Sequence, residues 1–159
     1  MSTPSLDFVA SVTSQRIANV IGKKVKNDKL VSPSDLENLV TKALGVLQSQ
    51  GVYAMALFLF SRSGDKTVKN EMTAEERCAV EIISRLYSLR NPSETLKNFN
   101  PSDFESEIKP NEVNSKKKEL LKEFADISND LDTLLLVRDL YEKILVYARF
   151  HAKAAKEGS

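Results

Sequence analysis

The sequence predicts an all-α protein: a single compact bundle of about six helices over residues 1–159, ending in a long C-terminal helix. Three observations carry this prediction. Apolar residues recur every three or four positions along most of the chain. Capping sequences begin two of the periodic segments. A third segment, Val52 to Phe60, is nine consecutive apolar residues, too few for a membrane span of roughly 20. It is therefore expected to be the central core helix.

The composition is that of a globular protein in a reducing compartment. Hydrophobic residues make up 42% and charged residues 28% of the chain, a balance that separates globular from disordered sequences. The net charge is +1, so a nucleic-acid role would have to rest on local clusters. The single cysteine, Cys78, has no partner for an intrachain disulfide, and no basic segment followed by an apolar one begins the chain. We expect a soluble, cytoplasmic protein with no membrane segment.

The first helix is expected over residues 5–26, with Ser5 as its N-cap. Four lysines gather at and just beyond its end: Lys23, Lys24, Lys26 and Lys29. Two interpretations are open. Lysines suit a helix C-terminus because of the macrodipole, or they form a patch that contacts phosphates.

Two further helices follow on either side of a glycine. Ser32-Pro33-Ser34-Asp35 opens an amphipathic helix to Gln50, Gly51 breaks it, and the apolar helix continues to about Ser61. A polar loop from Arg62 to Glu71 comes next. It contributes three basic candidates for a binding site: Arg62, Lys66 and Lys69.

The fourth helix is expected from Thr73, whose capping box is completed by Glu76, to Arg90, where Asn91-Pro92 stops it. Arg77, Glu81 and Arg85 are spaced four apart. We expect them to form an ion-pair ladder on a solvent-exposed face.

Residues 91–114 are the least regular part of the chain. They hold three prolines and a local charge of −3, from five acidic and two basic side chains. Two short helical turns are expected, over 93–99 and 102–107, with four apolar anchors: Leu96, Phe99, Phe104 and Ile108. The recurring anchors indicate a long connection or lid that packs on the bundle.

Two helices complete the bundle, over residues 115–127 and from 129 or 130 to 155. Lys116, Lys117 and Lys118 open the first of them, where positive charge opposes the macrodipole. That placement favours a functional use, with a solvated turn as the alternative. The last helix, roughly 39 Å long, carries a mostly basic stripe on the face opposite its apolar residues: Arg138, Arg149, Lys153 and Lys156, interrupted by Glu142. Such a stripe is typical of a phosphate-binding helix, and also of an ordinary polar face.

Motifs for catalysis are missing from the sequence. It contains neither G-x-x-x-x-G-K-[ST] nor G-x-G-x-x-G. One histidine, His151, expected to be partly buried, and one cysteine are too few for the usual His/Cys metal sites. We therefore expect no enzyme, no metal and no cofactor, and predict a helical binding or scaffolding module.

Two stretches resemble a known family. Gln50-Gly51-Val52-Tyr53 with Ala56-Leu57-Phe58-Leu59, and the C-terminal run from Leu140 to Phe150, are similar to the small subunit of CRISPR type III-B (Cmr) effector complexes. The two stretches cover about a quarter of the chain, and the acidic segment 91–114 departs from the family pattern. Small subunits of type III-A and type I-A complexes are similar in build.

The resemblance implies a non-catalytic subunit whose copies stack as a minor filament in an antiviral ribonucleoprotein. Its partners would be the large polymerase-like subunit, the backbone subunits, guide RNA and target RNA, contacted through the phosphate backbone. The candidate RNA contacts are fourteen basic residues: the four lysines of residues 23–29, the three basic residues of the 62–71 loop, the lysines of residues 116–118, and the four basic residues of the stripe on the last helix. The alternatives are a helical protein–protein adaptor without RNA binding and, third, a small carboxylate-based hydrolase.

Overall fold

A computed structural model describes residues 4–102 and 105–158. Seven α-helices are present in these ranges: α1 (Leu6–Ala18), α2 (Pro33–Gln50), α3 (Val52–Arg62), α4 (Ala74–Tyr87), α5 (Pro92–Asn98), α6 (Lys117–Asp126) and α7 (Leu131–Glu157). Five 3-10 turns join them: η1 (Lys26–Asp28), η2 (Lys69–Glu71), η3 (Pro110–Glu112), η4 (Asn114–Lys116) and η5 (Ile127–Asn129). The all-α prediction is confirmed, and the long C-terminal helix is present.

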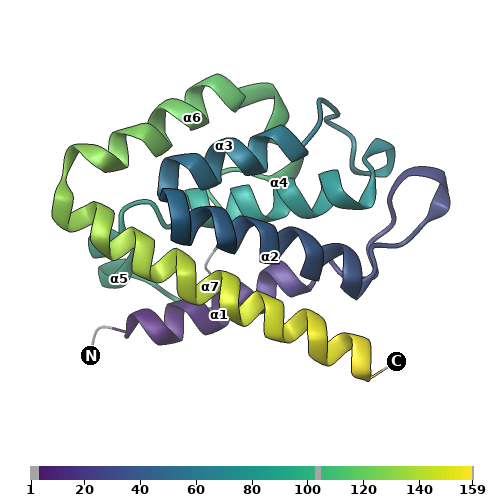
Figure 1. The fold of residues 1–159 in the computed structure, drawn as a ribbon, viewed down its shortest axis with the longest axis horizontal. Helices are drawn as coiled ribbons and strands as arrows, with labels where there is room; N and C mark the ends of the chain where they lie inside the picture. Colours follow the sequence, from purple (N-terminus) through teal and green to yellow (C-terminus); the bar gives the residue numbers. More distant parts are fainter. Residues whose placement is uncertain (1–3, 103–104, 159) are drawn as a thin grey trace.

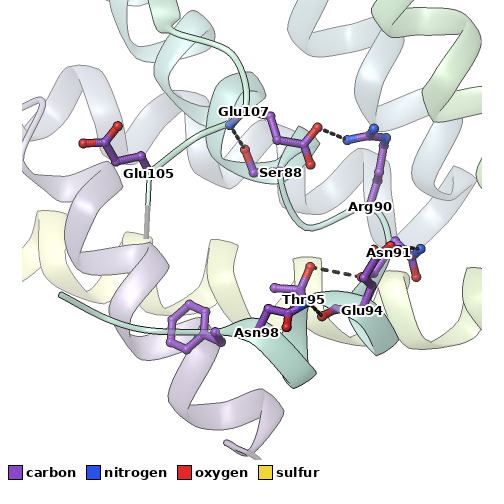
Figure 2. A pocket seen from close by; sticks show the side chains of 9 residues that line it. Ser88, Arg90, Asn91, Glu94, Thr95, Asn98, Glu105 and Glu107 are labelled. Carbon is purple, nitrogen blue, oxygen red and sulfur yellow. Dashed lines mark hydrogen bonds and ion pairs between the residues drawn. The ribbon is translucent and has the colours of Figure 1, made fainter. Parts of the chain in front are cut away.

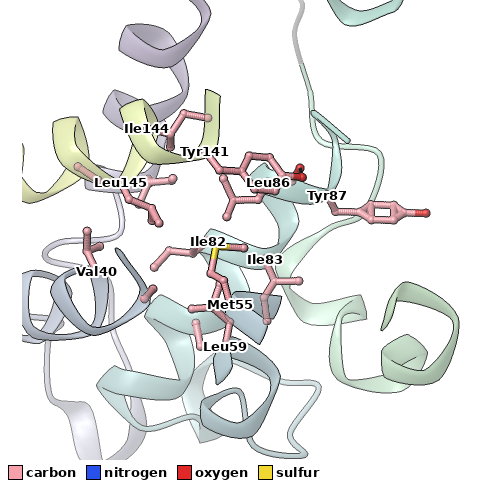
Figure 3. Packing of buried hydrophobic residues seen from close by; sticks show 14 of the residues in the cluster. Val40, Met55, Leu59, Ile82, Ile83, Leu86, Tyr87, Tyr141, Ile144 and Leu145 are labelled. Carbon is pink, nitrogen blue, oxygen red and sulfur yellow. Dashed lines mark hydrogen bonds between the residues drawn. The ribbon is translucent and has the colours of Figure 1, made fainter. Parts of the chain in front are cut away.

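The helices are arranged around one apolar core (Figure 1). α7 runs along both α1 and α2, α3 follows α2 across the bundle, and α6 lies on the far side of α3. Figure 3 shows where α2, α3, α4 and α7 meet: Val40, Met55, Ile82, Leu86 and Leu145 point into the same space.

α4, and not α3, is the central helix. Ten of the 14 residues of α4 are buried, whereas Tyr53 and Leu57 of α3 are 41% and 44% exposed. The expectation for the apolar run is wrong on this point. An apolar helix can still have one face open to solvent, because apolar composition does not determine how many neighbouring helices pack against it.

The first helix is shorter than expected. α1 ends at Ala18, and residues 19–32 form a loop closed by main-chain hydrogen bonds from Gly22 N to Val31 O and from Val25 N to Lys29 O, both 2.8 Å. Asn27 and Asp28 turn this loop with φ of 62° and 59°, a conformation that asparagine and aspartate tolerate. The four lysines therefore do not end a helix, and the macrodipole interpretation is wrong.

Gly51 joins α2 and α3, as the sequence predicts. Its φ of 98° lies in the region open to glycine. Its amide donates to Leu47 O at 3.0 Å, and its carbonyl accepts from Met55 N at 3.1 Å. One residue therefore ends one helix and starts the next.

We expect Gly51→Ala to lower the free energy of unfolding by about 1–2 kcal/mol, because an L side chain is strained at this φ. Gly45, in the exposed middle of α2, is the matched control, since an added Cβ would meet no atom within 4 Å. Gly45→Ala should raise the stability by about 0.5–1 kcal/mol. Urea denaturation of both variants tests the prediction, and two changes of the same sign would contradict it.

The connection between α4 and α6 packs on the bundle as a lid. Ser84 Oγ donates to Ile108 O, and Glu107 N donates to Ser88 Oγ at 2.9 Å. Phe99 packs edge-on against Phe8 of α1, with ring centroids 6.0 Å apart. The first expected turn is confirmed as α5. Residues 105–107 of the second are not helical, and Phe104 lies outside the described residues.

Candidate nucleic-acid interface

A buried ion-pair triad lies on α4. Arg77 Nη1 is 3.0 Å from Glu81 Oε1, and Arg85 Nε is 3.1 Å from Glu81 Oε2. The side chains of Arg77 and Glu81 are 5% and 8% exposed. The predicted ladder is therefore present, but its exposed position is wrong, because the chain around Ile108 and η3 covers this part of α4.

Further cations surround the triad. Burial lowers the pKa of the Lys69 ammonium, and Arg77, Lys23 and Lys109 lower this pKa further, opposed by Glu81. These groups come from separate segments: the 19–32 loop, η2, α4 and the start of η3. We refer to the following residues as the Glu81 cluster: Lys23, Lys69, Arg77, Glu81, Arg85 and Lys109.

The Glu81 cluster has a surplus of positive charge. Two arginines share the Glu81 carboxylate, and Lys23, Lys69 and Lys109 add positive charge to the same region. Both oxygens of Glu81 are already occupied by arginines. Of the three guanidinium nitrogens of Arg77, Nη1 alone has a partner among the described residues. The cluster therefore favours an additional anion, and phosphate oxygens accept from arginine and lysine with the right geometry.

Main-chain contacts position the cluster. Lys26 N donates to Met72 O at 2.8 Å and joins the 19–32 loop to the segment that begins α4. The α4 capping box forms as predicted, with Thr73 N 2.8 Å from Glu76 Oε1 and Glu76 N 3.2 Å from Thr73 Oγ1. The loop lysines that the sequence predicted, Lys24, Lys26 and Lys29, are exposed beside this junction.

Two basic candidates of the loop after α3, Arg62 and Lys66, differ in their contacts. Arg62 is 3.5 Å from Glu75 and lies over the Phe58 ring, 5.1 Å from its centroid. Lys66 is exposed on the following loop.

Lys117 has a structural role. Its Nζ donates to Phe60 O at 3.4 Å and to Gly64 O, two carbonyls at the end of α3, where a cation is favourable. Lys116 is 3.9 Å from Glu112, and Lys118 is exposed. Lys118 is therefore the member of this run that remains available for phosphate.

The basic stripe of α7 is not a free face. Arg138 Nη2 donates to Gln48 O at 2.9 Å, and Lys156 Nζ lies 3.6 Å from Glu37 Oε2. Both partners belong to α2. Arg149 and Lys153 are half-buried between them. The stripe therefore borders the contact between α7 and α2. Whether its residues are free depends on where α2 packs.

An acidic surface lies around the C-terminal end of α4 (Figure 2). Two hollows of about 410 and 260 Å³ share Arg90 and Asn91. Six carboxylates line them: Glu94, Glu105, Glu107, Glu123, Asp126 and Asp130. Among the described residues Arg90 is the only basic one that lines them, 3.0 Å from Glu107 and 3.1 Å from Glu123.

Sequence reasoning found part of the interface. It named Lys23 and Lys69 but missed Arg77, Arg85 and Lys109. The signal available was the ratio of two arginines to one glutamate in the ladder, since a balanced surface ladder has equal numbers. The burial of Arg77 and Arg85 and the approach of Lys109 depend on how the lid packs.

Other site types have no support among the described residues. No group of three or more His, Cys, Asp or Glu is placed to hold a metal in residues 4–102 and 105–158. None of the helices described has an apolar stretch long enough to cross a membrane. Comparisons with protein-family models, with curated proteins and with solved structures found no match.

Proposed function

We propose that this protein is a non-catalytic, RNA-binding helical subunit that contacts the phosphate backbone through the Glu81 cluster and the neighbouring lysines of the 19–32 loop. The observation that carries the proposal is the surplus charge: two arginines occupy both oxygens of one carboxylate, and three lysines add positive charge to the same region. Backbone contacts of this kind give affinity without sequence readout. The sequence would be read by base pairing with a guide.

The assembly we propose is the CRISPR type III-B effector complex, with the chain as its cytoplasmic small subunit. The two stretches named above, around Gly51 and in α7, support this choice, and small subunits of type III-A and type I-A complexes are the nearest alternatives. The partners would be the large polymerase-like subunit, the backbone subunits, guide RNA and target RNA.

The distribution of charge on the protein supports the stacking of its copies in a filament. The acidic surface has six carboxylates and one arginine, and the Glu81 cluster has a net positive charge. The acidic surface lies beyond the C-terminal end of α4, whereas Lys69 and Arg77 of the cluster lie at or before its N-terminal end. An acidic surface placed on a neighbour's basic surface would compensate both. A filament built in this way would leave part of each basic surface for RNA.

We expect Lys69→Glu/Lys109→Glu to lower affinity for single-stranded RNA about 30-fold at low salt, because two phosphate contacts become repulsive. The slope of log K against log salt should become shallower by about 1.4, at 0.7 per lost contact. Fluorescence anisotropy with a labelled 20-nucleotide RNA measures both quantities.

The control is Lys97→Glu/Lys122→Glu, which makes the same change in net charge at exposed positions of α5 and α6. It should bind within twofold of wild type. Equal losses in both variants would mean that net charge, and not this surface, governs binding. If wild-type protein purified with its partner subunits contains no RNA, the proposal is wrong.

A protein–protein adaptor is the second candidate, and one observation favours it. The chain from Ala43 to Ser61 contains no charged residue, and Tyr53 and Leu57 are exposed within it. Depletion of charge with an exposed aromatic residue is typical of the centre of a protein interface.

A further inference from the structure

An aromatic groove lies between α1 and α7. It has a volume of about 390 Å³ and is lined by Ser11, Ser14, Tyr147, Phe150, His151 and Ala154. The Phe150 side chain is 62% exposed. In contrast, Tyr141 on the same helix is buried with its hydroxyl bonded to Leu86 O at 2.6 Å. Phe150 therefore offers a largely exposed ring at the edge of the groove.

The polar groups of the groove select the kind of molecule that would fit. Tyr147 is held in place because its hydroxyl donates to Asp7. Ser11 Oγ donates to Phe8 O at 2.7 Å, and Ser14 Oγ donates to Ser11 O at 3.0 Å. The Ser11 and Tyr147 hydroxyls have thus used their one proton and present lone pairs as acceptors, whereas the Ser14 hydroxyl is buried. A flat aromatic ring with amino groups at its edge matches this combination better than an aliphatic side chain.

Two lysines of α7 flank the Phe150 ring along the helix. Lys143 also borders Asp139 and Glu142 in a neighbouring hollow. Lys153 is one turn after Phe150 and Lys143 is two turns before it, so both lie along the same side of the helix. Aromatic rings flanked by cations are the arrangement with which proteins bind single-stranded nucleic acid: bases stack, and phosphates meet the cations.

We propose that this groove binds an unpaired nucleobase of RNA, which stacks on Phe150 while the adjoining phosphates lie toward Lys143 and Lys153. The inference rests on the proposed RNA-binding function. It adds a base-stacking site to a surface of backbone contacts. Because every base has an aromatic face, the site would not select a sequence.

The test uses the full-length protein and a single-stranded RNA with 2-aminopurine at one position. Stacking on Phe150 should quench the fluorescence of that base. Phe150→Ala should abolish the quenching and lower affinity about tenfold without changing the salt slope. Phe150→Tyr should retain both properties. An RNA with an abasic site at the probe position should bind wild type and Phe150→Ala equally.

Leu135→Ala is the matched control, since Leu135 is an exposed apolar residue of α7 outside the groove. It should leave quenching and affinity unchanged. Affinity of Phe150→Ala within twofold of wild type, with quenching retained, would overturn the inference and leave the proposed function standing. Absence of RNA binding by wild type would overturn both. Loss of self-association in Phe150→Ala, measured by sedimentation while RNA binding is retained, would assign the groove to a protein side chain and also overturn the inference.

Discussion

Glu81→Ala should lower the free energy of unfolding by about 3–5 kcal/mol, because it leaves a buried arginine without its carboxylate. The Arg77 side chain is 5% exposed, and its guanidinium has no other hydrogen-bond partner among the described residues. Arg85 loses the same carboxylate. Urea denaturation with linear extrapolation measures the change. A change under about 1 kcal/mol would mean that water reaches the pair.

The control is Glu75→Ala. Glu75 is 46% exposed and lies 3.5 Å from Arg62, and exposed pairs of this kind contribute little. We expect a change of no more than about 0.5 kcal/mol. The difference between the two changes in unfolding free energy shows how much of the effect comes from burial and how much from an ion pair alone.

Cys78 supplies an independent measurement. Burial raises the pKa of its thiol to about 12, with Asp35 as the next cause, and the thiolate is the reactive form. At pH 8 the native protein therefore holds Cys78 as the thiol, and reaction with an alkylating reagent needs opening of the fold. Glu81→Ala should accelerate this reaction. Since the folded-state pKa is raised, the fold also loses stability as the pH rises above the ordinary thiol pKa.

A triple variant separates stability from binding. Arg77→Met/Glu81→Leu/Arg85→Met replaces the whole triad with apolar side chains of similar size, which is often neutral for stability. It also removes two of the five cations of the cluster. We expect a near-wild-type fold with weaker RNA binding.

Arg90→Ala should lower the free energy of unfolding by about 2–3 kcal/mol, because one side chain joins three parts of the structure. The guanidinium carbon lies 4.0 Å from the centroid of the Tyr87 ring, and Nη1 donates to Tyr87 O at 3.1 Å. Ion pairs to Glu107 and Glu123 reach the lid and α6. Because those two carboxylates are 55% and 39% exposed, the contacts to Tyr87 should account for most of the change.

Arg90→Lys tests this division. Lysine keeps the charge but not the planar group that stacks on Tyr87, so most of the stability should still be lost. Retention of wild-type stability by Arg90→Lys in urea denaturation would show that charge alone is sufficient. Glu107→Ala, which removes the more exposed carboxylate, should cost less than about 1 kcal/mol.

The helices were predictable because their signals are local. The capping box at Thr73, Ser32 and Pro33 at the start of α2, and the break at Gly51 each concern neighbouring residues, and each is present in the structure. The end of α1 was not predictable in the same way. Apolar residues continue at Val20, Ile21 and Val25, but there the main chain bonds to the returning segment around Val31 and not along a helix.

The interface was less predictable because it depends on tertiary cover. A spacing of four places Arg77, Glu81 and Arg85 on one face of a helix, and this holds whether the face is exposed or buried. The lid decides between the two. The α7 stripe is the converse case: Arg138 was expected on an open face, and Gln48 of α2 binds it.

The bond from Lys26 N to Met72 O has a consequence for the entropy of binding. It couples two lysine-bearing segments that are more than 40 positions apart in the chain, the 19–32 loop and η2. Met72 is fully buried, so this anchor is fixed to the core. The two segments are thus preorganised during folding, and an arriving phosphate backbone need not order them. A short loop with four lysines would otherwise lose much of its affinity to that ordering.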